Sequence, residues 1–237
     1  MSIESRIRET LVEQRVDELL PYHFGEYKPR FIELSEKVMK DISSLSAFKE
    51  YHFMGLGDLK EYIKLYFEPF LQEDSELAKA MLHKQVNHDL TFISVTEVQI
   101  YASEPGYKRF SEIMMGTALA NDRIIGRLVR IGETEGIEKA VKKETRYDVL
   151  RKMFPTIEDY RKTFEPKMKG LEIIGYNTRT KISKALKEMC AGKPDFSKKL
   201  NSLITYFTEE AIGIVLEIEQ KCLDKQIVDI YGKEFFN

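Results

Sequence analysis

Three arginines at helical spacing are the residues of this chain whose pattern most clearly indicates a binding chemistry. Arg123, Arg127 and Arg130 are four and three positions apart, so on an α-helix their side chains lie on one face. Guanidinium groups in such a row form a cationic surface that pairs either with carboxylates of the same chain or with an anionic partner. We call these three residues the arginine ridge. The sequence leaves both kinds of partner open.

Two polar residues, Asn121 and Asp122, precede the ridge in a segment that is otherwise mostly apolar. This segment, 107–134, contains no proline, and its apolar residues would cover much of the circumference of a helix. A polar side chain buried there needs a partner, because an unpaired buried polar group costs about 1–3 kcal/mol. The partner is a ligand, a metal ion or another helix, and a structural network is the commonest of these outcomes.

His88 and Glu97 are candidates to line the same interior from a preceding helix. Di-iron bundles use Glu-x-x-His motifs, and none of the four histidines has a glutamate three positions before it. We therefore expect no metal and no cofactor, and the sequence identifies no catalytic residue. The candidate ligand-binding residues are His88, Glu97, Asn121, Asp122, Arg123, Arg127 and Arg130.

The charges are unevenly distributed along the chain. The net charge is −2, but residues 123–193 hold 18 Lys and Arg against 10 Asp and Glu, a balance of +8, so the remainder carries −10. This asymmetry indicates a charge match within the protein or between subunits, or an anionic partner of the basic part. A basic face over 123–152 is also typical of nucleic-acid binding. Interspersed glutamates and a pI of about 6.2 argue against a nucleic-acid partner.

Helical signals dominate the whole chain. The predicted long helices are 29–48, 74–103, 107–134 and 197–224, with shorter helices over 58–71 and within 137–191, the latter interrupted at Pro166 and Gly170. Residues 91–101 are rich in β-branched side chains, so a strand stays open there, but a lone strand would have no partner and we expect a helix. The sequence thus predicts an all-α fold, an antiparallel bundle of about four long helices with shorter helices packed on it.

The last predicted helix carries a heptad pattern typical of bundle packing. Its apolar positions alternate steps of four and three, at Leu200, Ile204, Phe207, Ala211, Ile214 and Ile218. The acidic residues of the same helix are interpreted as a solvated edge beside this apolar seam; they are Glu209, Glu210, Glu217 and Glu219.

A single domain over 1–237 is the favoured organisation, with 135–195 as the alternative candidate for a peripheral appendage because Pro and Gly break it most often. No run of 18 apolar residues indicates a membrane span, and the charged N-terminus does not resemble a signal peptide. The two cysteines, Cys190 and Cys222, form no CxxC motif. These features predict a soluble cytoplasmic protein with reduced thiols and no membrane partner.

Three functional hypotheses follow. The leading one is a non-enzymatic binding or scaffold module that forms a homodimer. The alternative is a small-molecule-binding or enzymatic bundle with a polar interior site, in which the arginine ridge receives an anionic group. The third is nucleic-acid binding through the basic 123–152 face. The enzyme hypothesis requires a polar-lined cavity, whereas the scaffold hypothesis predicts a filled core.

Overall fold

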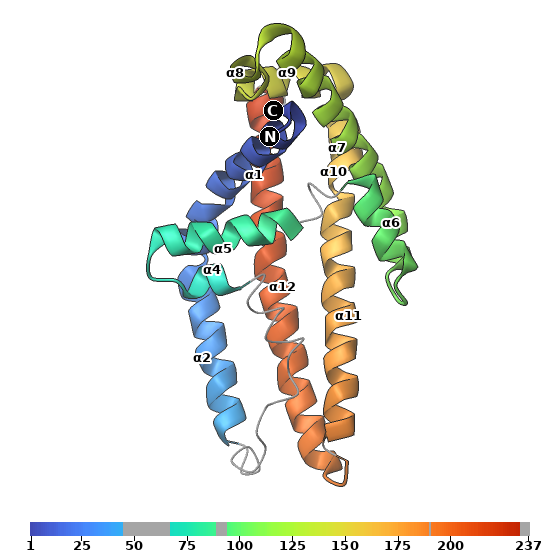
Figure 1. Ribbon diagram of the computed structural model, residues 1–237. Helices are drawn as coiled ribbons and strands as arrows, with labels where there is room; N and C mark the ends of the chain where they lie inside the picture. Colours follow the sequence, from blue (N-terminus) through green and yellow to red (C-terminus); the bar gives the residue numbers. More distant parts are fainter. Residues whose placement is uncertain (45–66, 89–93, 190, 233–237) are drawn as a thin grey trace. The chain divides into compact units, whose positions relative to one another are not determined.

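The computed structural model describes residues 1–44, 67–88, 94–189 and 191–232, and every regular element in these ranges is a helix (Figure 1). The all-α prediction is therefore confirmed. The chain divides into two compact units. The first contains Met1–Leu19, His83–Gly170 and Ile218–Asn237, and the second contains Leu20–Leu82 and Leu171–Glu217. Residues 135–195, the alternative candidate for an appendage, are divided between the two units. The single-domain organisation and the appendage both stay predictions.

The first unit is built around one apolar core. Its elements are most of α1 (Ile3–Leu20), the end of α5 (Ser75–His88), α6 (Val95–Ser103), α7 (Lys108–Glu135), α8 (Ile137–Ala140), α9 (Lys143–Met153), α10 (Ile157–Phe164), the first turn of α11 (Pro166–Met189) and the end of α12 (Pro194–Tyr231). The core side chains come mainly from α1, α7, α9, α10 and α12, and they include Ile7, Leu11, Ile124, Ile125, Leu128, Leu150, Tyr160, Phe164, Leu223 and Ile227.

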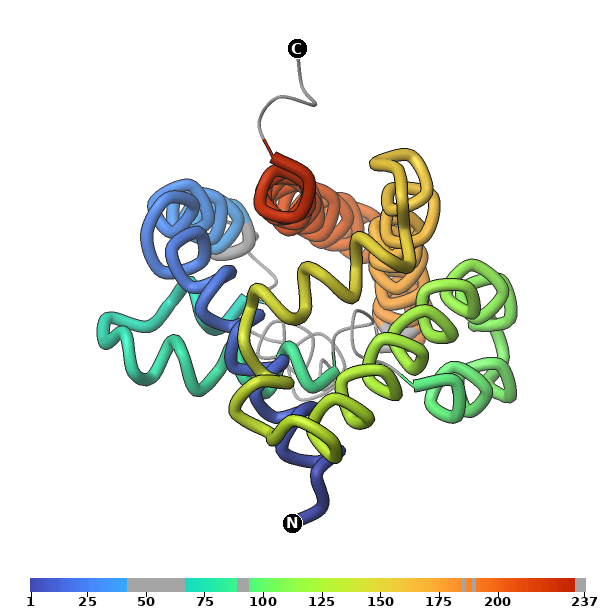
Figure 2. Tube along the Cα trace, turned by 90° about the horizontal axis from the view of Figure 1, so that it is seen from above, coloured from blue at the N-terminus to red at the C-terminus, as the bar shows by residue number. Residues whose placement is uncertain are grey.

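Helix α7 is the segment predicted as 107–134, within one residue at each end. It is amphipathic, and its buried face includes Met114, Ala118 and Leu128. Gly132 belongs to this face, and a Cβ there would lie 3.2 Å from Ile3 Cγ2, so glycine permits close contact with α1. Helix α6 runs alongside α7 in both views (Figures 1 and 2).

The predicted continuous helix 74–103 is wrong, because α5 ends at His88 and α6 begins at Val95. Ser94 has an extended backbone and its side chain accepts a hydrogen bond from Glu97 N, while Glu97 accepts one from Ser94 N. This capping box starts a new helix. Residues 95–101 are helical as expected, and 91–93 lie outside the described residues.

The predicted interruption of the helices at Pro166 and Gly170 is also wrong in part. Helix α11 begins at Pro166 and continues through Gly170 to Met189. Proline is well accommodated in a first helical turn, where its missing N–H has no intrahelical acceptor. At the start of the predicted helical segment 137–191, two helices, α8 and α9, separate at Val141 and Lys142. Helix α12 is longer than predicted and begins at Pro194. The predicted heptad positions from Leu200 to Ile218 are all buried.

The second unit has an aromatic core. It contains the π-helix η1 (Pro21–Glu26), α2 (Lys28–Ser44), α4 (Glu68–Leu71), the start of α5, most of α11 and the first part of α12. The ring of Phe31 stacks on Phe67 and Phe70 at centroid distances of 5.1 and 4.8 Å, and His23 lies 4.5 Å from Phe70. Most of the predicted helix 58–71 lies outside the described residues.

None of the described helices is both long and apolar enough to span a membrane. The arrangement of four long helices as one antiparallel bundle stays a prediction.

Candidate functional site

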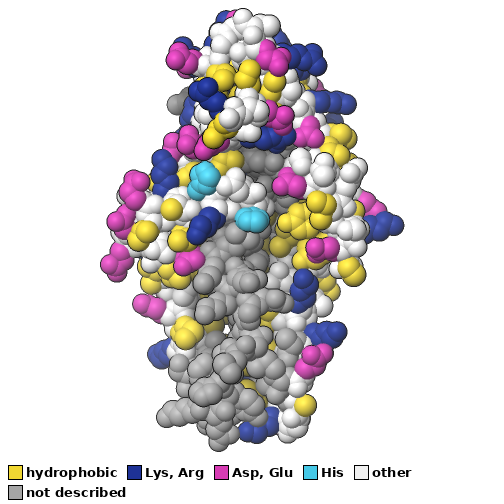
Figure 3. Space-filling view, viewed as in Figure 1, with side chains coloured by type: hydrophobic (Ala, Val, Ile, Leu, Met, Phe, Trp, Pro, Cys, Tyr) yellow, Lys and Arg dark blue, Asp and Glu magenta, His cyan; other side chains and the backbone are white. Residues whose placement is uncertain are grey.

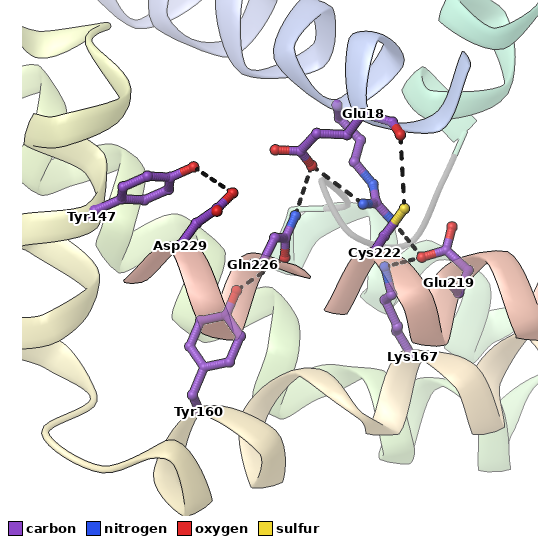
Figure 4. A network of polar contacts seen from close by, with 9 residues as sticks. Glu18, Tyr147, Tyr160, Lys167, Glu219, Cys222, Gln226 and Asp229 are labelled. Carbon is purple, nitrogen blue, oxygen red and sulfur yellow. Dashed lines mark hydrogen bonds and ion pairs between the residues drawn. The ribbon is translucent and has the colours of Figure 1, made fainter. Parts of the chain in front are cut away.

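A buried network of charged side chains lies in the first unit (Figure 4). Arg15 of α1 is 1 % exposed, and its guanidinium forms ion pairs with Glu18, at 3.4 Å, and with Glu219 of α12. Lys167, at the start of α11, forms a second ion pair with Glu219. Two cations and two carboxylates thus balance in the interior. Such pairing offsets the large desolvation penalty of each buried charge.

The network continues through neutral groups to α10. Gln226 donates from Nε2 to Glu18 Oε2 at 2.8 Å, and the Tyr160 hydroxyl donates to Gln226 Oε1 at 3.1 Å. Burial raises the pKa of Glu18, but Arg15 and Arg146 lower it more, with help from Gln226, so the net pKa is below its ordinary value. Glu18 therefore remains a carboxylate at neutral pH.

Cys222 lies beside this network, with its Sγ 4.0 Å from the backbone oxygen of Glu18. Burial raises the pKa of its thiol to about 11. Because the thiolate is the nucleophilic form, this cysteine is unsuited to covalent catalysis at neutral pH.

Asn121, one of the predicted site residues, faces this interior. It is 7 % exposed and lines a cavity of about 30 Å³ together with Arg146, Tyr160 and Gln226. That volume is enough for a water molecule but not for an organic ligand. Asn121 is therefore buried beside polar groups of this interior, and a ligand-binding role for it stays a prediction.

Asp122 has a different environment, and its side chain is 35 % exposed. Its carboxylate accepts a hydrogen bond from Val95 N at 3.3 Å and lies 3.5 Å from an Arg8 nitrogen. Through these two contacts, Asp122 connects α7 to the N-terminus of α6 and to α1. A carboxylate is favourable at a helix N-terminus, where the unpaired N–H groups carry partial positive charge.

Glu97 and His88 lie at the surface, not in an interior site with Asn121. Glu97 caps α6 and also lines an open cleft of about 450 Å³, whose other lining residues are Arg8, Val12, Asn87, Ser94, Thr96 and Ile125. The predicted residues thus separate into an internal cavity, a surface cleft and the arginine ridge. In the parts of the chain that the structure describes, no three His, Cys, Asp or Glu side chains are grouped as a metal site would require.

All three residues of the arginine ridge are exposed on α7. Among residues 1–44, 67–88, 94–189 and 191–232, no carboxylate forms an ion pair with Arg123, Arg127 or Arg130. Like charges four positions apart repel, and each such pair costs a helix several tenths of a kcal/mol. The ridge is therefore a concentrated positive charge that the described part of the chain does not neutralise.

The other basic residues of the predicted 123–152 face differ in their surroundings. Lys139 forms an ion pair with Glu135, and Arg151 forms one with Asp148. Arg146 is half-buried and lines the internal cavity. Figure 3 shows positive and negative side chains intermixed at the α8–α9 end of the view. Acidic side chains thus offset part of the basic charge of 123–152, while Lys142 and Lys143 are exposed, and nucleic-acid binding through this face stays a prediction.

The buried network itself was missed from the sequence, and Glu219 was wrongly interpreted as part of a solvated edge. Its position gave a signal: Glu219 is four residues after Val215 and three before Cys222, both of which are buried. Arg15 likewise lies between Leu11 and Leu19 on one helical face. A charged residue within an apolar stripe indicates a buried ion pair, although not its partner.

No known family, curated protein or solved structure matches this chain.

Proposed function

We propose that this protein is a non-enzymatic binding module whose arginine ridge on α7 binds an acidic protein surface. The observation that carries the proposal is the exposure of Arg123, Arg127 and Arg130 without a carboxylate partner in the described ranges. The buried charges of the same unit compensate one another, whereas the three arginines of the ridge are exposed side by side without such compensation in the described ranges. Arginine suits this role because its planar fork of donors pairs with carboxylates in a bidentate geometry.

An acidic protein surface is favoured over nucleic acid by the size of the ridge. Three arginines over two helical turns match a short row of carboxylates, whereas tight nucleic-acid binding uses a broader set of phosphate contacts. The neighbouring Lys139 and Arg151 are already paired with acidic side chains. The cytoplasmic location predicted from the sequence is part of this proposal, and Cys222, a buried free thiol, is compatible with it.

The test measures binding of a fluorescent polyglutamate peptide by anisotropy at low and high salt. The wild-type protein is expected to bind, and Arg127→Glu is expected to weaken binding about tenfold or more. Arg109→Glu is the matched control, since it makes the same charge change at an exposed position of α7, about 21 Å from Arg123 along the helix. Equal binding by both variants and the wild type would reject the ridge as the binding surface. Preferential binding of a duplex DNA probe would favour the nucleic-acid hypothesis.

A second candidate function is favoured by the cleft at Arg8, Asn87 and Glu97. Its volume of about 450 Å³ is in the range of small-molecule sites. Its lining combines Arg8, Glu97 and side-chain amide and hydroxyl groups with two apolar residues, so a small polar molecule would fit its chemistry. Native mass spectrometry of the freshly purified protein, compared with denaturing conditions, tests this directly. A co-purified small molecule whose retention is lost in Asn87→Ala would support the cleft as its site, and an unliganded mass would count against it.

A further inference from the structure

The first unit carries a row of carboxylates whose spacing resembles that of the arginine ridge. Glu9, Glu13 and Asp17 lie four residues apart on α1, and all three are exposed. Within the ranges that the structure describes, Glu9 and Glu13 form no ion pair. We call Glu9, Glu13 and Asp17 the carboxylate row. It is the acidic counterpart of the ridge on another helix of the same unit.

We propose that the arginine ridge of one copy of this protein binds the carboxylate row of a second copy. This proposal rests on the proposed function and names its partner. Charge complementarity at matched spacing supports it. At 1.5 Å per residue, the ridge extends about 10.5 Å from Arg123 to Arg130, and the carboxylate row extends about 12 Å from Glu9 to Asp17. The three arginines therefore lie along the carboxylate row when the two helices pair, and Glu9 and Glu13 are the anions that carry the proposal.

The middle members of the two rows are Arg127 and Glu13. They face each other whether the two helices pair in parallel or antiparallel, because reversing one helix exchanges only the outer members. Arg127 and Glu13 are thus the pair whose exchange of charge tests the contact in either orientation.

Both rows belong to the first unit of each chain. In a two-fold dimer the ridge of each copy would meet the carboxylate row of the other, so the same contact would form twice. Contacts of this kind are weakened by salt, because the Debye length falls from about 10 Å at 0.1 M to about 3 Å at 1 M. A dimer held by these rows is therefore expected to dissociate as the salt concentration rises.

Sedimentation velocity over a concentration series, at about 0.05 M and about 0.5 M salt, tests the proposal on the full chain. The wild type is expected to dimerise at low salt. Arg127→Glu and Glu13→Arg are each expected to weaken the dimer tenfold or more, whereas the control Arg109→Glu is expected to dimerise like the wild type. Circular dichroism establishes that each variant is folded. If Arg127→Glu does not fold, Arg127→Gln replaces it, with a smaller expected effect.

The decisive sample is an equimolar mixture of Arg127→Glu and Glu13→Arg. In a mixed dimer, one contact pairs a native ridge with a native carboxylate row. The other contact brings the two substituted side chains together, and these again carry opposite charges. A mixed dimer is therefore expected to form where each variant alone does not.

Failure of the mixture to dimerise, or a wild-type dimer that neither variant weakens, would overturn the proposal. A monomeric wild type would also overturn it. If that monomer still binds polyglutamate through Arg127, the proposed function stands and only the identity of the partner is wrong.

Discussion

Arg15 of α1 and Glu219 of α12 form a buried ion pair although 204 residues separate them in the sequence. Glu219 also forms an ion pair with Lys167, and Glu18 forms one with Arg15. The two carboxylates together compensate the two buried cations. The first unit is therefore assembled from segments at both ends and in the middle of the chain, and the Glu219 carboxylate lies where they meet. Removing it would leave positive charge in a site that water does not reach.

We expect Glu219→Gln to lower the free energy of unfolding by about 3–5 kcal/mol, because the substitution breaks a buried pair and leaves Arg15 and Lys167 without their shared carboxylate. Chemical denaturation measures this change. The control is Glu217→Gln, two residues earlier on α12, which removes a half-exposed ion pair with Arg30 and should cost less than about 1 kcal/mol. Equal losses in the two variants would contradict the assignment of Glu219 to the buried network.

Glu18 should make the free energy of unfolding depend on pH in the acidic range. The pKa of Glu18 in the folded protein lies below its ordinary value. Its contribution to the free energy of unfolding is therefore fully present above the pKa of a glutamate in the unfolded chain, about 4.3. That contribution is lost as the pH falls through the lower pKa of the folded protein. The free energy of unfolding, measured from pH 7 down to pH 3, should therefore fall more steeply in the wild type than in Glu18→Gln. Parallel curves would show that Glu18 is not ionised in the folded network.

Cys222 should be unreactive in the folded protein. With its pKa raised to about 11 by burial, only about one thiol in a thousand is ionised at pH 8. In a Cys190→Ser background, labelling of Cys222 by a thiol-specific disulfide reagent should be at least a hundredfold slower in native buffer than in denaturant. Rapid labelling of the native protein would show that the network around Glu18 opens frequently.

Asp122 should stabilise the start of α6. Asp122→Ala removes the acceptor for Val95 N and the ion pair with Arg8, at an expected cost of about 1 kcal/mol. Hydrogen exchange should then accelerate in Val95–Ser103 more than in α9. Ser94→Ala, which removes the N-cap side chain of the same helix, should have a similar effect of about 0.5–2 kcal/mol. Unchanged exchange in both variants would show that α6 is held by its packing on α7 alone.

Local sequence signals predicted the elements whose boundaries depend on nearby residues. Helix α7 follows from a proline-free amphipathic segment. Thr156 caps α10 by accepting a hydrogen bond from Asp159 N, which is also a local contact. The break at Ser94 is also a local signal. Ser94 and Glu97 form a capping box, whose sequence signature is a serine followed three residues later by a glutamate. Pro166 was ambiguous, because proline both ends one helix and begins the next.

The sequence by itself determined that this protein is helical and that Arg123, Arg127 and Arg130 share a face, because both properties follow from the helical repeat. Only the tertiary structure decided that this face is exposed, that Asn121 points inward, and that Arg15 meets Glu219. Which face of a helix is buried depends on the segments packed against it. Those segments are distant in sequence, so their contacts arise from the collapse of the whole chain around shared apolar surface and not from the spacing of neighbouring residues.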